Sequence, residues 1–511
     1  MKLLYFNFLL FSLSLTSIFS QVGYLDNSFG TNGKVSTNIG NYIDGITCVE
    51  LQLDGKIVAA GYSYVSNYED VVIVRYNSDG TLDNTFGLNG VVIQSLGNES
   101  ELVKDIYIQN DGKIILTGNT TNSLQPFYFV TRYNNDGTLD NSFNGSGIIL
   151  NDASTSGIHF NSIAVQPDNK IILGGAAKTG NFWSFSVARL NQDGSFDTTF
   201  DNDGIVIREV VTGYNEVFSI GLFSNGKIIA AGNATNGNDN DFALVSFNSD
   251  GSINEDFGGI NFKVTTDMGN SQNNFLNDMK VLTNDALIVG GFFDSTFDNI
   301  NFALAKYNSN GELDTSFGTN GMVHTDFGTS FDDAIHEIEI QYNGSIIACG
   351  NTVNNGYTDF GISKYSPNGV IDESFGQNGF ISTDYFQSND NISCSKLQTD
   401  GKLIVCGSTY DGSKQYFALA RYNIDSLTNT NDLFANKLAF YPNPTKNELY
   451  FNSSSNQNYE ISIYNLLGEE VLHDYLSLNK QKIDVQNFEN GVYFIKLNNN
   501  SKDMITKFIK E

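Results

Sequence analysis

The chain has 511 residues, of which 40% are hydrophobic and 17% charged, and it is several times longer than a single domain of ~150 residues. This composition excludes a disordered tail and a coiled coil. The chain carries 28 Lys and Arg against 57 Asp and Glu, a formal net charge of −29. Such an acidic chain repels phosphate groups, which argues against nucleic acid and anionic membranes as partners. The 49 Gly, 39 Phe and 25 Tyr beside only 5 Pro favour turns and strands, and so an all-β protein.

The beginning of the chain has the pattern of an export signal. Lys2 precedes a nearly continuous apolar stretch at 3–19, and small residues come before Gln21. The pattern predicts a secretory signal peptide over residues 1–20, removed by cleavage after Ser20. The alternative is a membrane anchor, but the stretch is at the short edge of what spans a bilayer. No later stretch is long and apolar enough, so we expect no transmembrane span in the mature chain.

Most of the remaining sequence is an internal repeat. One marker is a loop of the type Leu25-Asp26-Asn27-Ser28-Phe29-Gly30, and its phenylalanine returns at intervals of 57, 57, 57, 57, 60 and 58 residues. These phenylalanines are Phe29, Phe86, Phe143, Phe200, Phe257, Phe317 and Phe375. A second marker is a turn of the type Asp54-Gly55-Lys56, and a third is a strand end of the type Arg75-Tyr76-Asn77. A fixed period of this kind indicates a repeat architecture.

Each repeat predicts four strands. In the first unit we expect them at 46–53, 56–60, 71–76 and 91–94, with Asp-Gly as the first hairpin turn. Four strands in each of seven units predict a seven-bladed β-propeller over residues 23–423. The alternative is a solenoid, whose repeats are usually shorter, at about 20–45 residues.

The ends of the repeat region support a closed ring. The Leu-Asp…Phe-Gly loop precedes the first unit at Leu25 and is decayed after Asn423. We therefore expect residues 25–37 to supply the last loop and the outer strand of blade seven. Pairing the first strand with the last one removes the open edge of the sheet.

These three markers together resemble the delta-60 repeat family of β-propeller proteins, and more distantly the NHL-repeat propellers. The resemblance covers roughly residues 23–423 and implies a propeller. It carries no known catalytic residues, so none is transferred to this chain. From the residues themselves, we expect Gly30 and Gly33 to adopt positive φ, Asp26 to accept backbone N–H bonds, and Phe29 to be buried between blades.

Motifs of catalysis and metal binding are missing from the sequence. The four histidines have no ligand spacing, and no nucleophile elbow, zinc-protease or phosphate-loop motif occurs. We therefore predict no catalytic residue, no metal site and no cofactor. Export makes disulfides possible, but buried free thiols are the simpler account of the four cysteines. These are Cys48, Cys349, Cys394 and Cys406.

The two faces of the predicted propeller differ. The Asp-Gly-Lys turns and the Leu-Asp…Phe-Gly loops share one face, which we call the repeated face. The variable face carries the loops between second and third strands and the loops between blades, which are unlike one another. Variable loops on a rigid scaffold are where function usually resides. We expect aromatic side chains there to stack on sugar rings, although such aromatics can also merely cover blade edges. The candidate ligand-binding residues are Tyr64, Trp183, Phe293, Tyr357 and Tyr410.

The period stops after Asn423. Residues 424–436 have the composition of a linker, and 437–511 alternate in short predicted strands that suggest a small β-sandwich. This tail resembles the type A C-terminal sorting domain of the type IX secretion system of Bacteroidetes. The residues that carry the resemblance are Pro442, Asn443, Pro444, Gly468, Gly491, Tyr493 and Lys507. The resemblance implies passage across the outer membrane, then removal of the tail and release or surface attachment.

The sequence therefore predicts a secreted or cell-surface propeller that is handled by the type IX secretion machinery. We expect a binding or adhesion module for an extracellular glycan or protein. The alternatives are an extracellular carbohydrate-active enzyme and a structural surface protein without a specific ligand. The missing catalytic motifs argue against the enzyme.

Overall fold

The computed structural model divides the chain into two compact units, one spanning 21–425 and the other containing 426–511. The predicted signal peptide lies outside the described residues, as does most of the predicted linker. The described residues are 23–40, 42–65, 68–97, 99–120, 127–151, 157–237, 239–269, 273–296, 299–327, 333–354, 356–425, 439–441, 445–452, 459–465, 470–476, 482–498 and 503–510.

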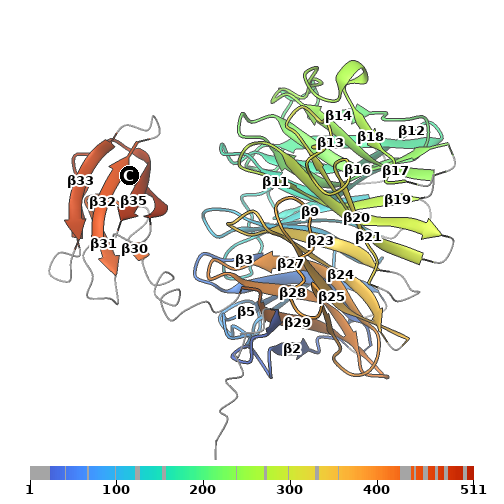
Figure 1. The fold of residues 1–511 in the computed structure, drawn as a ribbon, viewed down its shortest axis with the longest axis horizontal. Helices are drawn as coiled ribbons and strands as arrows, with labels where there is room; N and C mark the ends of the chain where they lie inside the picture. The colour runs from blue at the N-terminus through green and yellow to red at the C-terminus, as the bar shows by residue number, and fades with distance from the viewer. Residues whose placement is uncertain are drawn as a thin grey trace, which may run out of the picture. The chain divides into compact units, whose positions relative to one another are not determined.

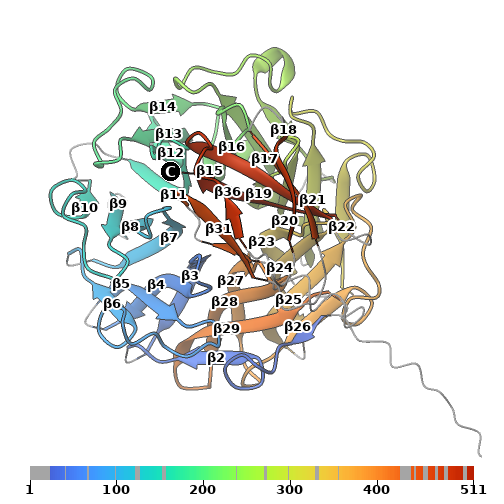
Figure 2. The same ribbon diagram turned by 90° about the vertical axis from the view of Figure 1, so that its left-hand side faces the viewer.

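The first unit is a propeller of seven antiparallel sheets, as the repeat predicts, and the sheets follow one another around a centre (Figures 1 and 2). Blades one to three consist of β3 (Asp44–Leu51), β4 (Ile57–Tyr64), β5 (Glu69–Tyr76) and β6 (Val91–Gln94); β7 (Glu101–Ile108), β8 (Ile114–Thr120), β9 (Phe127–Tyr133) and β10 (Ile148–Leu150); and β11 (Ile158–Val165), β12 (Ile171–Thr179), β13 (Phe182–Leu190) and β14 (Ile205–Arg208).

The other four blades repeat this order from the innermost strand outward. They consist of β15 (Asn215–Leu222), β16 (Ile228–Asn236), β17 (Asp239–Phe247) and β18 (Val264–Thr266); β19 (Asn274–Val281), β20 (Leu287–Thr296), β21 (Asn299–Tyr307) and β22 (Met322–Thr325); β23 (Ala334–Ile340), β24 (Ile346–Asn354), β25 (Tyr357–Tyr365) and β26 (Phe380–Thr383); and β27 (Asp390–Leu397), β28 (Lys402–Tyr410) and β29 (Gln415–Asn423) with β1 (Tyr24–Leu25) and β2 (Lys34–Thr37).

The first hairpin turn of the first repeat lies where the sequence predicts it, and the strands beside it are shifted slightly. Gln52 N donates to Lys56 O at 2.9 Å and Gly55 N donates to Gln52 O at 2.9 Å. Because this turn begins at Gln52, β3 ends at Leu51 rather than at 53. Gly55 has a φ of 84°, which a residue with a side chain adopts only at a cost.

The ring closes through the N-terminal piece, which confirms the prediction for residues 25–37. Lys34 to Thr37 of β2 pair with Ala420 to Phe417 of β29, and β1 pairs with the end of the same strand. Blade seven therefore takes its outer strand from the opposite end of the repeat region. The described sheets of the propeller form a closed circle, because each inner strand packs beside the next one around the centre.

The seven repeated phenylalanines are fully buried, as expected, and pack in the cores that join neighbouring blades. In four blades the phenylalanine lies beneath an Arg–Asp clamp that brings the other two markers together. In blade one, Arg75 Nε donates to Asp83 Oδ2 at 2.8 Å, and the guanidinium lies 4.6 Å from the ring centre of Phe86. Lys56 of the Asp-Gly-Lys turn lies 3.4 Å from the same carboxylate, and Arg75 Nη1 donates to the main-chain oxygen of Asn135 in blade two at 2.5 Å. The clamp therefore joins three parts of one blade to the next blade.

The Arg–Asp clamp recurs in four blades, through Arg75, Arg132, Arg189 and Arg421. Blades five and six have a lysine instead. Lys306 Nζ lies 3.1 Å from Asp314, and Lys364 Nζ donates to the main-chain oxygen of Ile424 at 3.1 Å. Blade four has Ser246 at this position.

The second unit contains two sheets, which agrees with the predicted β-sandwich. One sheet has the order β30-β31-β34 and the other β33-β32-β35-β36. Their strands are β30 (Ala439–Tyr441), β31 (Glu448–Asn452), β32 (Tyr459–Tyr464), β33 (Glu470–Leu476), β34 (Lys482–Asp484), β35 (Gly491–Asn498) and β36 (Asp503–Lys510). The sequence did not predict β33 and β34. Within the described ranges the one helix is the 3-10 turn η1 (Gly259–Asn261), and no helix there has the length and apolarity to cross a membrane.

Candidate functional site: the central well and the variable face

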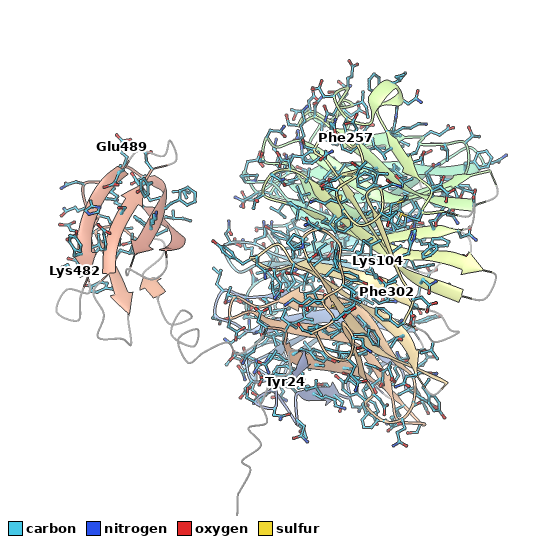
Figure 3. All side chains as sticks on the ribbon, viewed as in Figure 1. Tyr24, Lys104, Phe257, Phe302, Lys482 and Glu489 are labelled. Atoms are coloured by element: carbon cyan, nitrogen blue, oxygen red, sulfur yellow. The ribbon has the colours of Figure 1, made fainter. Side chains whose placement is uncertain are left out.

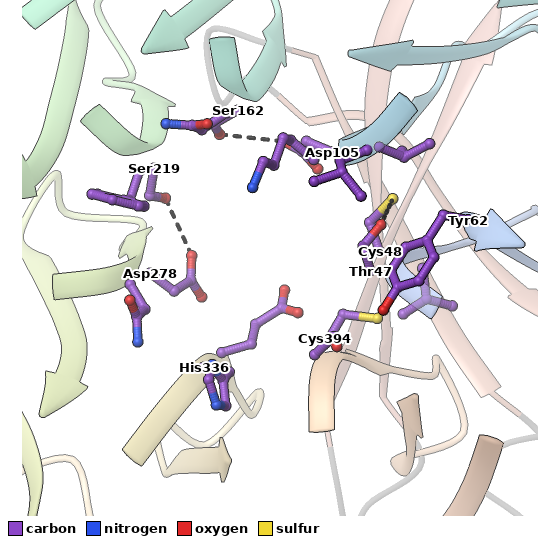
Figure 4. Close-up of a pocket in the computed structure, with 18 of the residues that line it drawn as sticks. Thr47, Cys48, Tyr62, Asp105, Ser162, Ser219, Asp278, His336 and Cys394 are labelled. Atoms are coloured by element: carbon purple, nitrogen blue, oxygen red, sulfur yellow. Dashed lines mark hydrogen bonds between the residues drawn. The ribbon is translucent and has the colours of Figure 1, made fainter. Parts of the chain in front are cut away.

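A cavity of about 620 Å3 lies at the centre of the propeller, lined by all seven inner strands (Figure 4). We call it the central well. Every inner strand carries a β-bulge at the same place, where two of its residues oppose one residue of the second strand. The bulge residues that line the well are Thr47, Lys104, Asn161, Phe218, Asn277, His336 and Ser393. The residue that lines the well therefore differs from blade to blade, whereas the loops of the repeated face are nearly the same in every blade.

The residues that follow the bulges bind the blades to one another. Asp105 Oδ2 accepts a hydrogen bond from the backbone N–H of Ile163 in the next blade at 2.7 Å. Ser162, Ser219, Asp278 and Glu337 accept corresponding bonds at 3.2, 3.2, 3.1 and 2.7 Å. Cys48 and Cys394 occupy these positions in blades one and seven. These polar side chains thus satisfy backbone groups along the inner strands.

A network of charges lies on the same strands, toward the Asp-Gly turns. Lys280 Nζ lies 3.1 Å from Asp278, 3.2 Å from Glu337 and 3.6 Å from Glu339. Burial raises the pKa of Glu337 to about 7. Burial opposes the charge of Lys280, but the three carboxylates raise the pKa of this lysine well above its ordinary value. The ammonium group therefore stays charged and shields the acids from one another.

Burial shifts the pKa values of two titratable side chains of the well in the direction that favours their neutral forms. Burial raises the pKa of Asp105 to about 6 and lowers the pKa of His336 to about 4. His336 Nε2 lies 3.0 Å from Asn351 Nδ2, so the neutral ring accepts this bond. Lys104 is an exposed cation that lines the well. The well can therefore offer both hydrogen-bond donors and acceptors to a polar ligand.

Exposed aromatic side chains gather on the variable face. Among the described residues of the propeller, seven exposed Phe and Tyr side chains lie in variable-face loops, and Tyr342 lies on the repeated face. The seven are Tyr42, Tyr68, Phe182, Tyr214, Tyr357, Phe386 and Tyr410. Five of them belong to blades six, seven and one, and we call Tyr357, Phe386, Tyr410, Tyr42 and Tyr68 the aromatic arc.

In blade one another aromatic residue, Tyr62, lines the central well. A Cβ atom at position 45 would lie 2.8 Å from the Tyr62 hydroxyl oxygen, so Gly45 leaves the space for this ring. Phe386 of the arc lies beside Tyr416, with 6.3 Å between ring centres. Tyr416 OH donates to Asp411 Oδ2 at 2.7 Å, which places a carboxylate beside these rings.

The five predicted ligand-binding residues have different environments. Tyr357 and Tyr410 are exposed members of the aromatic arc, with 46% and 39% of their surface accessible, and Tyr64 is half-buried at the end of β4. Phe293 differs from the expectation of an exposed ring. It is 6% exposed and belongs to a hydrophobic core, and His324 covers it at 4.2 Å between ring centres.

Trp183 belongs to a second polar cluster, between blades three and four. Its ring meets His159 edge-on, with 4.8 Å between ring centres, and Tyr214 at 6.5 Å. His159 Nε2 lies 2.7 Å from Glu216 Oε1, and the hydroxyl of Tyr214 donates to the other oxygen of Glu216. Both oxygens of this buried carboxylate therefore have hydrogen-bond partners. Trp183 contributes an aromatic ring to the cluster.

Three carboxylates approach one another between blades six and seven, where the sequence predicted no metal site. Oxygens of Asp359, Asp384 and Asp390 lie within 4.8 Å of one another. Asp390 Oδ2 accepts from Tyr385 N at 2.7 Å, and Ser382 donates to Asp359 at 2.8 Å. Burial raises the pKa of Asp390 to about 6. Gln387 N donates to Asp384 Oδ1 at 2.6 Å, so the chain's own donors contact all three carboxylates.

The sorting residues are only partly described. Pro442, Asn443, Pro444 and Gly468 lie outside the described residues. Gly491 begins β35, and Lys507 lies in β36, where it pairs with Phe494. Tyr493 is 7% exposed, stacks on Phe508 at 5.4 Å, and donates its hydroxyl to Glu489 O at 2.9 Å. Tyr493 therefore anchors the core of the second unit.

Sequence reasoning missed the ring of bulges and the polar lining of the well. A signal existed, because the positions seven and eight residues before each turn glycine are mostly polar within otherwise apolar strands. Phe386 and Tyr62 were also not named as site residues. Their loops differ in each blade, and no sequence pattern indicates which loop aromatics remain exposed.

Two family models match the sequence. One is the domain of unknown function DUF5122, a β-propeller, which matches 52–86, 109–143, 166–200, 224–257, 284–317, 341–375 and 398–426. The other is the secretion system C-terminal sorting domain, which matches 439–511. The repeats of this chain therefore belong to the DUF5122 β-propellers, and its tail is a type IX sorting domain. The tail indicates export through the periplasm to the outer-membrane surface or the medium.

No curated protein matches this sequence. Solved structures that are similar include Sqt1 from Chaetomium thermophilum, with 12% identity and a TM-score of 0.42, covering 77% of this chain and 99% of that one. The polysaccharide lyase Uly1 has 11% identity and a TM-score of 0.40, covering 80% and 98%. A GH43 endo-arabinanase from Bacillus licheniformis has 10% identity and a TM-score of 0.26, covering 71% and 98%. At these values the likenesses say nothing about the ligand or activity of this chain.

Proposed function

We propose that this protein is an exported binding module whose ligand is an extracellular glycan held on the variable face. The observation that carries the proposal is the aromatic arc of Tyr357, Phe386, Tyr410, Tyr42 and Tyr68, exposed on the variable face. The proposal includes a cleaved signal peptide at 1–20, a propeller domain at 23–423, a linker at 424–436 and a sorting domain at 437–511.

The chemistry of the face fits a sugar chain better than an apolar ligand. Aromatic rings present a flat apolar surface with a polar tip on tyrosine, which suits the C–H face of a sugar ring and its hydroxyls. The well adds neutral and charged hydrogen-bonding groups, including Lys104, Asn161 and Asn277. Trp183 offers a second stacking surface beside His159 and Glu216, and the Glu216 carboxylate accepts a bond from Asn161 of the well. The acidity of the chain favours neutral or cationic glycans over strongly anionic ones.

Binding is favoured over catalysis because the carboxylates on the inner strands of the well have structural partners. Asp105 accepts two backbone N–H bonds, from Ile106 and Ile163, and Glu337 accepts one from Ser395 while it neighbours Lys280. A glycosidase needs one carboxyl group free to protonate the leaving group and a second to act on the sugar. Acids that hold the inner strands together are poorly placed for that exchange.

The test is a glycan array probed with the labelled mature full chain, followed by calorimetry on each glycan that binds. We expect Tyr357→Ala and Tyr410→Ala to weaken binding at least about tenfold each, because stacked aromatics usually dominate such contacts. Tyr342→Ala, which removes an exposed ring from the repeated face, is the matched control and should leave affinity unchanged.

Equal loss in the Tyr342→Ala variant would show that the ligand does not bind on the variable face. Binding to a purified surface protein, with no glycan bound, would favour the protein-binding form of the module. Release of sugar products from a bound glycan would make the chain an enzyme and would contradict the structural role of Asp105 and Glu337.

A further inference from the structure

Blade four lacks the guanidinium group that the clamp of blades one, two, three and seven contains. Ser246 occupies the position of the arginine, and Asn254 occupies that of its aspartate. Asn254 Nδ2 donates to Ser246 Oγ at 3.1 Å, so the amide takes the place of the Nε–carboxylate bond. The Nη1 and Nη2 groups of the arginine have no counterpart in this blade.

A cavity of about 230 Å3 lies at this place on the repeated face. Its lining includes Phe223, Lys227, Asn254, Asp256, Asp285 and Ser309. Phe223 stands where blades one to three have a glutamine, and it lines the cavity.

The cavity has counterparts of the atoms that hold a guanidinium in the complete clamps. There, Nη1 donates to a main-chain oxygen of the next blade, as Arg132 does to Gln192 at 2.5 Å. The corresponding residue for blade four is Ser309, which lines the cavity. Nη2 of Arg132 donates to the Ser142 hydroxyl at 3.2 Å, and Asp256 takes that position in blade four.

The aromatic residue that lines the cavity is Phe223, and Phe257 lies outside the lining. Phe257, which Figure 3 labels, is fully buried at the position where Phe143 lies 4.6 Å from the guanidinium of Arg132. Its ring lies 6.3 Å from that of Phe223. An aromatic face beneath a planar cation is a favourable arrangement.

The charge balance of the cavity admits another cation. Lys227 Nζ donates to Asn254 Oδ1 at 2.6 Å and lies 3.5 Å from Asp256, and Asp285 adds a second carboxylate. In blade three, Lys170 and Arg189 both contact the single carboxylate of Asp197, at 2.8 and 2.7 Å. A neighbouring lysine therefore does not exclude a guanidinium in this fold.

We propose that the blade-four cavity is a receptor for a guanidinium group of another molecule, namely an arginine side chain of a protein or peptide partner. The planar fork would donate to Ser309 O and to the Asp256 carboxylate beside the ring of Phe223, which lines the cavity. An ammonium group fits less well, because it lacks the fork that reaches both acceptors and the flat face that lies on the ring. This site is independent of the glycan site on the variable face.

The test is calorimetric titration of the mature full chain with ethylguanidinium and, separately, with ethylammonium at matched ionic strength. We expect saturable binding of ethylguanidinium that is at least about tenfold tighter than that of ethylammonium. Ser246→Arg supplies the missing group from the chain itself and should abolish the binding. Equal binding of both cations, or no saturable binding of either, would overturn the proposal.

A second pair of variants decides the matter if Ser246→Arg does not fold. Asp256→Asn removes the proposed carboxylate, and Glu255→Gln removes an exposed carboxylate from the adjacent residue. We expect Asp256→Asn to weaken ethylguanidinium binding at least about fivefold and Glu255→Gln to leave it unchanged. The same weakening in both variants would show a general effect of charge, and the proposal would be wrong.

Discussion

Arg421 Nε donates a hydrogen bond to Asp26 Oδ2 at 2.8 Å, although 395 positions separate the two residues in the sequence. Lys402 Nζ also lies 2.8 Å from this oxygen, and Arg421 Nη1 donates to the main-chain oxygen of Ser78 in blade one. The bond that closes the ring is thus the same clamp that joins strands within other blades. A propeller built from one repeated unit needs no separate device for closure.

We expect Arg421→Ala to lower the free energy of unfolding of the propeller by about 3 kcal/mol, because it removes one partner of a buried ion pair. Arg421→Lys should cost less than half as much, since Lys306 and Lys364 occupy this position in blades five and six. Urea unfolding of the mature chain measures both. The exposed substitution Glu312→Ala is the control, and an Arg421→Ala variant as stable as that control would contradict the role of the clamp in closure.

The buried phenylalanines should contribute much more to stability than exposed apolar residues of the repeated face. Phe29 is fully buried in the core between blades, and we expect Phe29→Ala to cost about 3–5 kcal/mol of unfolding free energy. Leu53 of a nearby turn is fully exposed, and Leu53→Ala should change stability by less than about 0.5 kcal/mol. Thermal unfolding of the two variants compares them directly, and similar losses would show that the blades do not pack around Phe29.

Stability should be highest at mildly acidic pH. Burial raises the pKa of Asp390 to about 6, whereas an unfolded aspartate has a pKa of about 4. The folded state therefore holds a proton that the unfolded chain releases, and this stabilisation is lost as the pH rises from about 4 through 6. Burial likewise raises the pKa of Glu101 to about 7.

Protonation of the clamp aspartates should lower the stability at strongly acidic pH. Although burial opposes it, the bonds from Ser142 and the charge of Arg132 lower the pKa of Asp140 to about 2. This stabilisation is present above the unfolded pKa of about 4 and is lost as the pH falls through about 2. We expect a higher melting temperature near pH 5 than near pH 8, and a smaller difference in Asp390→Asn. A melting temperature that rises steadily from pH 5 to pH 8 would contradict the assignment.

Removal of the tail should separate folding from export. The type IX sorting domain occupies 439–511, and the propeller forms a compact unit of its own. We expect a chain that lacks 437–511 to accumulate in the periplasm with the propeller still folded. Cell fractionation and limited proteolysis measure the two properties. The full chain is the control, and surface display of the shortened chain would show that the tail is dispensable for export.

The sequence by itself determined the number of blades, the order of their strands and the closure of the ring. The period, the Asp-Gly turns and the displaced first loop are local signals, and turn chemistry acts within a few residues. The tail could likewise be assigned from short motifs, although β33 and β34 were missed because their apolar pattern is weak.

Only the tertiary structure decided which of the repeated residues meet. Arg75 reaches Asn135 in the next blade, and Asp105 reaches Ile163, so each contact spans about one repeat period and leaves no local pattern. Exposure was also decided in three dimensions. Phe293 lies in a variable-face strand end as Tyr410 does, but His324 from the fourth strand covers its ring and Met268 belongs to the same core. Burial depends on the side chains that neighbouring strands place over a residue, and this information is not local to the residue itself.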